Sequence, residues 1–484
     1  MKYSVLYLSL LLLHFFNNGY AQTTTLPVPP NSGAFGSFVT VLPNGNYVVN
    51  DPNYSEGALT NIGAVYLYNG STNTIISKIK GSTSGDQIGG TAGIRSGVTV
   101  LTNGNFVILS GLWDNGSIQD AGAATWGSAT TGVSGTISAA NSIIGDHVPS
   151  VFGPDGVGEW CTALTNGNYV ILSRSWNNNR GAITWGNGTT GTAGVVSSSN
   201  SLVGTTGGSV GDYIGSDFNG ILALNNGNYV VSSQYWNNGA ISKAGAVTWG
   251  NGSIGTIGVV SISNSIVGTH TDDRVGTRTI ALTNGNYVTH TNAWDNAGTV
   301  DAGAVTWGNG LTGTVGVVGN GNSITGVTAN DQVGGAIGVY ALKNGNYVVA
   351  SPLYNDGILA DVGAVTWGNG ATGTSGPVFN FNSMVGTTAG DRIGSTSQAN
   401  FLRGAVTPLS NGNYVFSSSL WHNGAIAGAG AVTWCNGSSA TIGNVTTANS
   451  LVGSKTSDNV GSIVTALTNG NYVVGSQNWD NGAL

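Results

Sequence analysis

Short apolar runs alternate with turns rich in Gly and Asn along almost the whole chain. In one typical segment, residues 221–224 (Ile-Leu-Ala-Leu) lead into the turn Asn226-Gly227, and residues 229–232 (Tyr-Val-Val-Ser) follow. Asn-Gly is the dipeptide that most favours a two-residue β-hairpin, because both positions accept positive φ. Two further runs, 245–249 and 264–268, complete the segment. The pattern predicts about four short strands and almost no helix.

The same segment returns roughly every 60 residues, which is typical of a repeat architecture. Its Asn-Gly-Asn turns begin at Asn44, Asn103, Asn166, Asn226, Asn284, Asn344, Asn411 and Asn469. Each unit opens on an apolar-Gly pair: Phe35-Gly36, Ile88-Gly89, Val157-Gly158, Ile214-Gly215, Val275-Gly276, Val333-Gly334, Ile393-Gly394 and Val460-Gly461. In all but the first, an aspartate stands two residues before the pair; we call these the junction aspartates: Asp86, Asp155, Asp212, Asp273, Asp331, Asp391 and Asp458. We expect them to accept backbone N–H groups of the junction turn; the alternative is a carboxylate ring around a channel mouth that could hold a cation.

Apolar residues occupy both alternate sets of positions along the strands, as Val230 and Val231 show. Such strands fit a sheet that is covered on both faces. A four-stranded antiparallel sheet between two copies of itself is a propeller blade. We therefore predict an all-β fold, a β-propeller of about seven four-stranded blades, with a β-solenoid or extended β array as the alternative. Residues 33–460 would form the seven-repeat propeller and 461–484 an incomplete eighth repeat with exposed strand edges, as in a piece of a longer protein.

The N-terminus has the pattern of a secretory signal peptide, residues 1–21. Lys2 is followed by an apolar run over residues 5–16, and Ala21 ends a small-residue cleavage site. That run is too short to span a bilayer, and no later stretch is apolar enough. Residues 22–32 form a Pro- and Thr-rich leader. We expect a secreted or cell-surface protein without a membrane span.

Composition narrows the choice of function. Only 7% of the 484 residues are charged, the net charge is −7, and no Lys/Arg cluster exists that could neutralise phosphates. These features argue against nucleic-acid binding. The two cysteines, Cys161 and Cys435, occupy non-equivalent places in their units. We therefore expect two buried free thiols, with a disulfide as the alternative.

A ring beside an amide or carboxylate recurs after the second run of each unit, and it is the strongest candidate for ligand binding. Such a pair can stack on a sugar face and bind its hydroxyls. Repetition along one rim would add multivalency. The alternative is that each ring packs between neighbouring units while the Asx residue caps the loop. The candidate residues are Trp113, Asp114, Trp176, Trp236, Trp294, Asp295, Trp421, Trp479 and Asp480.

A second tryptophan series lies in the third run of the units and is predicted to pack between them. Its members are Trp126, Trp185, Trp249, Trp307, Trp367 and Trp434. Catalysis finds little support, because His147, His270, His290 and His422 fall at non-equivalent places without a Ser or Cys partner pattern. We expect no enzyme.

The pairs Phe35-Gly36 and Asn53-Tyr54 and the run 63–68 (Gly-Ala-Val-Tyr-Leu-Tyr) resemble the FG-GAP repeat of integrin-α-type β-propellers. Residues 202–204 and 212–215 are similar to the junction of that repeat, and the resemblance covers about residues 33–484. The units also resemble uncharacterised repeats of bacterial secreted and surface proteins. The resemblance implies seven blades around a channel, closed by joining the first and last strands. FG-GAP hairpins often carry a calcium loop with several carboxylates. Here the Asn-Gly-Asn turn replaces it, so we expect no metal and no cofactor.

Three functions fit these observations. The first is an exported, non-enzymatic binding or adhesion module whose partners are surface glycans or extracellular proteins. The second is a lectin-like propeller with carbohydrate at the Trp-Asx loops. The third is an accessory domain of a larger, truncated enzyme.

Overall fold

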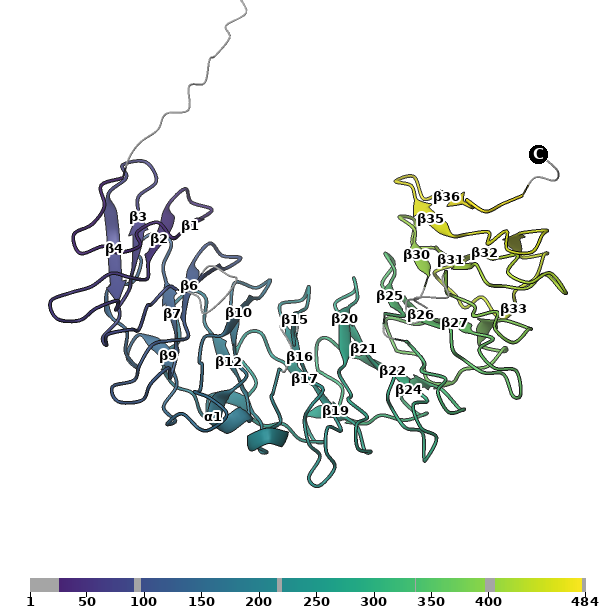
Figure 1. Ribbon diagram of the computed structural model, residues 1–484, viewed down its shortest axis with the longest axis horizontal. Helices are drawn as coiled ribbons and strands as arrows, with labels where there is room; N and C mark the ends of the chain where they lie inside the picture. Colours follow the sequence, from purple (N-terminus) through teal and green to yellow (C-terminus); the bar gives the residue numbers. More distant parts are fainter. Residues whose placement is uncertain (1–25, 91–96, 216–219, 336, 397–404, 481–484) are drawn as a thin grey trace, which may run out of the picture.

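The computed structural model describes residues 26–90, 97–215, 220–335, 337–396 and 405–480, which form a curved row of small β-sheets (Figure 1). The predicted signal peptide lies outside these residues, and the leader is described only from residue 26. We number the repeats 1 to 8 from the N-terminus, each beginning at its apolar-Gly pair. No helix of the described residues is long and apolar enough to cross a membrane.

Each repeat contributes strands in a fixed order. The first strands are β1 (Phe38–Val41), β5 (Val98–Val100), β10 (Trp160–Ala163), β15 (Ile221–Ala223), β20 (Arg278–Ala281), β25 (Val339–Ala341), β30 (Val406–Pro408) and β35 (Ile463–Ala466). The second strands are β2 (Tyr47–Asp51), β6 (Phe106–Ser110), β11 (Tyr169–Ser173), β16 (Tyr229–Ser233), β21 (Tyr287–Thr291), β26 (Tyr347–Ser351), β31 (Tyr414–Ser418) and β36 (Tyr472–Gly475). The third strands are β3 (Ala64–Tyr68), β7 (Ala123–Gly127), β12 (Ala182–Gly186), β17 (Ala246–Gly250), β22 (Ala304–Gly308), β27 (Ala364–Gly368) and β32 (Ala431–Cys435). The fourth strands are β4 (Ile75–Lys80), β9 (Ser142–Ile144), β14 (Ser201–Val203), β19 (Ser265–Val267), β24 (Ser323–Thr325), β29 (Ser383–Val385) and β34 (Ser450–Val452).

A two-residue strand from the next repeat completes each of the first six sheets. These strands are β8 (Gly135–Thr136), β13 (Gly194–Val195), β18 (Gly258–Val259), β23 (Gly316–Val317), β28 (Gly376–Pro377) and β33 (Gly443–Asn444), and each pairs in parallel with the fourth strand of the preceding repeat. The other pairings are antiparallel, as the sequence predicts. The only helical pieces of the described residues are α1 (Trp176–Asn179) and the short 3-10 turn η1 (Gly208–Val210).

All but one of the hydrophobic clusters of the described residues lie between two successive sheets; the exception is formed by repeat 1 with Leu26 of the leader. In one cluster, Val170 and Leu202 of repeat 3 pack with Tyr229, Val231 and Trp236 of repeat 4. Most of the apolar burial of a repeat is therefore shared with its neighbours, and its stability depends on them. The third-strand tryptophans of repeats 2 to 6 pack against these clusters, which confirms the packing role predicted for them. For Trp434 of repeat 7, which is 47% exposed, the prediction is wrong.

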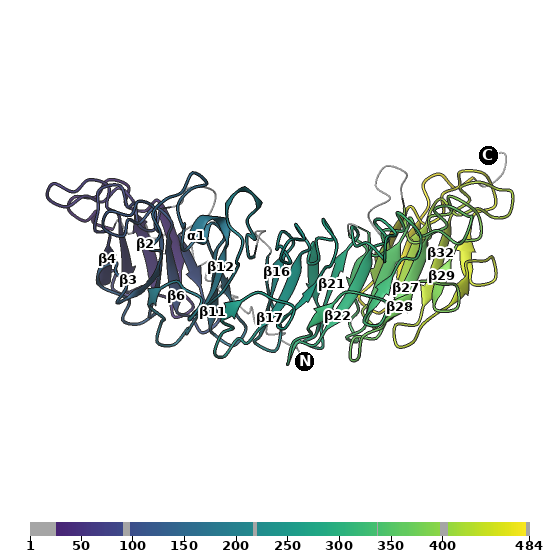
Figure 2. The same cartoon turned by 90° about the horizontal axis from the view of Figure 1, so that it is seen from below.

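The all-β repeat fold predicted from the sequence is confirmed, but the sheets do not close into a ring. No strand pairing joins the first and last sheets of the described residues. Figure 1 shows an open arc with β1–β4 at one end and β35–β36 at the other, and Figure 2 shows the same row of sheets from below. The first strands line its inner side (Figure 1). The arrangement is closer to the predicted alternative, an extended β array, than to a closed seven-bladed propeller.

Both cysteines are buried and unpaired, as predicted. Burial raises the pKa of the Cys161 thiol to about 12 and that of Cys435 to about 11. Both thiols are therefore protonated and unreactive at neutral pH.

Candidate functional site

The junction aspartates hold the turns between repeats. Asp212 is fully buried, and its Oδ2 accepts the N–H groups of Thr205 and Thr206 at 2.7 and 2.8 Å. Its Oδ1 accepts the N–H of Asn237 at 3.0 Å. The other six aspartates are equally buried, and each accepts three backbone N–H groups in the same way. The role predicted for this series is confirmed.

Burial and hydrogen bonding act on these carboxylates in opposite directions. Burial raises the pKa of Asp273 above its ordinary value, while the N–H groups of Asp295, His270 and Thr269 lower it. The N–H groups satisfy the charge that burial would otherwise penalise. These aspartates thus have a structural role at every junction.

The Asn-Gly-Asn turn has a second task that sequence reasoning missed. The Nδ2 groups of Asn226 and Asn228 in repeat 4 both donate to the carbonyl oxygen of Gly310 in repeat 5, at 2.8 and 2.9 Å. Trp249 Nε1 donates to the same oxygen at 2.9 Å. We call this three-donor contact the clamp. The turn itself needs only Asn-Gly. The second asparagine, which recurs in every repeat, could therefore have pointed to this contact.

The tryptophans predicted to bind ligand are buried in the loops between second and third strands. Trp113, Trp176, Trp236, Trp294 and Trp421 are only 3–5% exposed. Their ring faces are therefore not open for stacking on a sugar, and the burial favours the packing alternative. Trp479, next to the end of the described residues, is 52% exposed. The structure does not bring these six rings together, since each lies in its own repeat.

The neighbouring Asx residues cap the loops. Asp114 Oδ1 accepts the N–H of Asp120 at 2.8 Å, and Asp295 Oδ1 accepts that of Asp301 at 2.9 Å. Asp480 is exposed, and its N–H donates to Asp458. Ligand binding by these three carboxylates stays a prediction.

Repeat 3 departs from this regular scheme. Nine positions separate Trp294 from Gly303 in repeat 5, but only five separate Trp176 from Gly181 in repeat 3. The short loop still closes with the same bond, from the Gly181 N–H to the Trp176 carbonyl oxygen at 3.1 Å. Asn177 and Asn178 make this possible because they adopt left-handed φ values of 47° and 62°, which asparagine tolerates better than most residues.

The junctions on both sides of repeat 3 are longer than the others. From the glycine after the fourth strand to the junction aspartate there are five positions at Gly268–Asp273, but ten at Gly145–Asp155 and eight at Gly204–Asp212. The shortened loop and the two long junctions lie next to each other. Two pockets open beside them.

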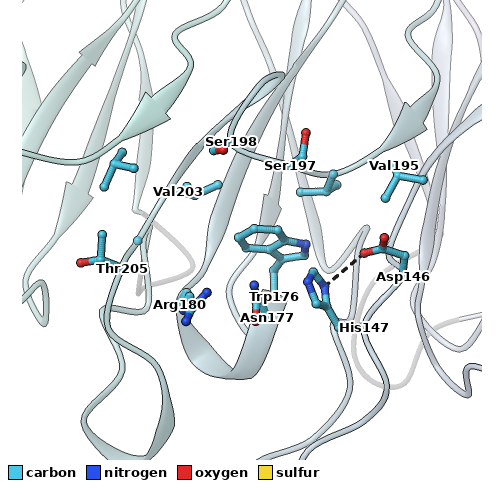
Figure 3. Close-up of a pocket in the computed structure, with 13 residues that line it drawn as sticks. Asp146, His147, Trp176, Asn177, Arg180, Val195, Ser197, Ser198, Val203 and Thr205 are labelled. Atoms are coloured by element: carbon cyan, nitrogen blue, oxygen red, sulfur yellow. Dashed lines mark ion pairs between the residues drawn. The ribbon is translucent and has the colours of Figure 1, made fainter.

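The first, which we call the Trp176 pocket, has a volume of about 470 Å³. Figure 3 shows Trp176 between Arg180 on one side and the pair Asp146 and His147 on the other. His147 Nδ1 lies 3.0 Å from Asp155 Oδ2, and this hydrogen bond raises the pKa of His147 against the opposing effect of partial burial. The pocket thus carries a cation, a carboxylate and an imidazole at its rim.

The second, the Tyr213 pocket, has a volume of about 650 Å³ and lies between repeats 3 and 4. Phe152, Tyr213 and Tyr235 line it together with Asn179, Arg174 and Lys243. The two tyrosine rings lie edge to face, with centroids 6.2 Å apart. Buried Asn179 donates from Nδ2 to the Tyr213 hydroxyl at 3.0 Å and so fixes it. Arg174 pairs with Glu159, and Lys243 pairs with Asp272.

A family model described as a repeat of unknown function (DUF5650) matches the chain eight times. The matched segments are residues 41–90, 100–153, 163–216, 223–277, 281–335, 341–395, 408–462 and 466–484. The chain belongs to this repeat family. The match supports the repeat architecture, but not the FG-GAP identity that the sequence suggested. No curated protein matches the chain.

Within this DUF5650 array, the pocket aromatics are departures from the repeat. Positions equivalent to Tyr213 hold Gln87, Gly156, Arg274, Gln332, Arg392 and Asn459. Positions equivalent to Tyr235 hold Leu112, Ser175, Ala293, Leu353, Leu420 and Asn478. Sequence reasoning searched for what the repeats share and missed these residues. An alignment of the repeats with each other would have marked them.

Proposed function

We propose that the protein is an exported, non-enzymatic binding module that holds a neutral saccharide in the Tyr213 pocket. One observation carries the proposal: Phe152 from the junction before repeat 3 lines one pocket together with Tyr213 and Tyr235, and no other repeat places an aromatic residue at either tyrosine position. Residues that pack one repeat against the next recur in all repeats. The pocket aromatics do not recur, so packing of the repeats does not explain them.

The chemistry of the pocket suits a sugar. Aromatic rings offer apolar surface to the C–H face of a pyranose, while a few polar groups fix its orientation. The Tyr213 hydroxyl and the Asn179 amide are such groups. Both cations are already paired with carboxylates, so the pocket has little excess charge to attract an acidic ligand.

A glycan array probed with the full chain tests this function. We expect binding to neutral oligosaccharides and a loss of at least tenfold in affinity for the double variant Tyr213→Ala/Tyr235→Ala. The matched control is Gln332→Ala/Leu353→Ala, which alters the equivalent positions at another junction and should bind like the wild type. Absence of binding across the array, or an equal loss in the control, would overturn the proposal.

The second candidate is the lectin-like use of the repeated Trp-Asx loops at residues such as Trp236 and Asp295. Buried rings weaken it, because a sugar could reach only the loop carboxylates and amides. A change of Asp295 to Ala without effect on glycan binding would count against it.

A further inference from the structure

Three metal-ligating side chains converge at the junction before repeat 3, at the rim of the Trp176 pocket. His147 Nδ1 lies 3.2 Å from Asp146 Oδ1 and 3.0 Å from Asp155 Oδ2. One ligand atom of each residue lies within 4.8 Å of the other two. We propose that Asp146, His147 and Asp155 bind a divalent transition-metal ion such as Zn²⁺ or Mn²⁺. This site is distinct from the Tyr213 pocket and does not depend on saccharide binding.

The two distances from His147 Nδ1 suit such an ion. Bonds of about 2.1 Å in a tetrahedral site place neighbouring ligand atoms roughly 3.4 Å apart, close to the two distances from His147 Nδ1. One imidazole with two carboxylates is a ligand set used by Zn²⁺ and Mn²⁺. Three protein ligands leave a position for water.

One ligand is already held in place. Asp155 is 2% exposed, its Oδ2 accepts the N–H groups of Asp146 and His147, and its Oδ1 accepts that of Asn177. A carboxylate fixed by the backbone loses little conformational freedom when it binds an ion. Asp146 is exposed and His147 is half-buried, so an ion can reach them from solvent.

A second observation concerns Trp176. Its side chain is 95% buried, as 5% of its surface is exposed, and its Nε1 has no hydrogen-bond partner. Figure 3 shows the indole nitrogen on the side where Asp146 and His147 lie, and the two rings meet edge to face at 5.1 Å. A water molecule on the ion would accept this N–H. Arg180, whose charge would oppose a cation, lies on the other side of the indole (Figure 3).

The chain contains its own negative control before repeat 5. There His270 occupies the place of His147 and Asp273 that of Asp155, but Thr269 replaces Asp146. His270 Nδ1 lies 3.7 Å from Asp273 Oδ2. Trp294 Nε1 is also unpartnered, so the indole is shared while the third ligand is not. Asp146 is therefore the residue that distinguishes the proposed site.

Calorimetric titration of the chelator-treated full chain with ZnCl₂ and with MnCl₂ tests the proposal. We expect one site, a loss of at least tenfold in affinity for Asp146→Thr, which copies the junction before repeat 5, and a similar loss for His147→Gln. His270→Gln should bind like the wild type.

Thermal unfolding of each variant without metal checks that the fold is intact, and Co²⁺ absorption spectra give a second readout of the ligand set. Absence of binding, equal binding by Asp146→Thr, or an equal loss in His270→Gln would each overturn the proposal. Glycan binding measured with and without chelator separates a failure here from a failure of the saccharide site.

Discussion

The junctions before repeats 3 and 5 solve the same packing problem with different surroundings. Asp155 and Asp273 are both buried and each accepts three backbone N–H groups. Asp146, His147 and Phe152 of the junction before repeat 3 line the Trp176 and Tyr213 pockets, whereas residues 269–272 before repeat 5 line neither of these two pockets. The comparison shows that one packing arrangement serves both junctions, while Asp146 and Phe152, which line the pockets, occur only before repeat 3.

Loss of a junction aspartate should have the largest effect on stability, and the effect should be the same before repeat 3 and before repeat 5. Asp155→Ala and Asp273→Ala each leave three N–H groups of part-buried hydrogen bonds without an acceptor, so each should lower the free energy of unfolding by about 4 kcal/mol. Asp295→Ala, which removes the acceptor of a single N–H, should lower it by about 1 kcal/mol. Urea unfolding in the absence of metal measures the three values. If Asp155→Ala lowered the free energy of unfolding no more than Asp295→Ala, the two junctions would not share the same packing arrangement.

Lowering the pH should destabilise repeat 5 through His290, which has no counterpart in repeat 3. His290 in β21 is buried without a side-chain partner, and burial, with a smaller contribution from Arg278, lowers its pKa to about 4; the equivalent residue in β11 is Leu172. Since the unfolded state binds the proton more tightly, stability is full above pH 6.5 and falls toward pH 4, by on the order of 3 kcal/mol.

The variant His290→Ser, which copies Ser232 of repeat 4, provides the test. Its stability should change less between pH 7 and pH 4 than that of the wild type. The raised pKa values of Asp86 and Asp273 act in the opposite sense in both proteins, so the difference between the two profiles isolates His290. Parallel profiles would contradict the account.

Making repeat 3 regular should remove its binding properties and preserve its packing. Replacing residues 177–180 with the eight residues 295–302 of repeat 5 restores the nine-position loop. Because Asn179 fixes the Tyr213 hydroxyl, saccharide affinity should fall at least tenfold. The midpoint of thermal unfolding should change by only a few degrees. Unchanged saccharide affinity in the grafted protein would contradict this prediction, because it would show that binding does not need the irregular loop.

Loss of one clamp hydrogen bond should have the smallest effect on stability, and the effect should be equal in repeats 3 and 5. Trp185→Phe in repeat 3 and Trp307→Phe in repeat 5 each remove one hydrogen bond, to Gly252 and to Gly370, and keep most of the ring. Each should lower stability by about 1 kcal/mol. Values differing by more than about 2 kcal/mol would show that the repeats do not share the clamp.

How much of this could be predicted from the sequence differs between fold and site. Strand order, the places of the hairpins and the role of Asp212 followed from periodicity, because strand propensity is local. The predicted two-residue turn with positive φ at both positions was wrong: Leu224 and Asn228 are hydrogen-bonded around a three-residue loop in which only Gly227 has positive φ. The open arc did not, since curvature depends on the small rotation between neighbouring repeats. Burial of Trp236 was undecided, because a ring beside an asparagine suits both a core and a sugar site. Tyr213 was hidden among 17 tyrosines until the fold placed it beside Tyr235.

Hydrogen exchange of the full chain, with and without the oligosaccharide that binds best on the array, tests the central claim most directly. We predict slower exchange confined to the irregular region, around residues 150–155, 174–180, 208–213 and 235–243. Slower exchange spread evenly over the Trp-Asx loops of repeats 2, 5 and 7 would contradict the claim that binding resides where the repeat pattern breaks.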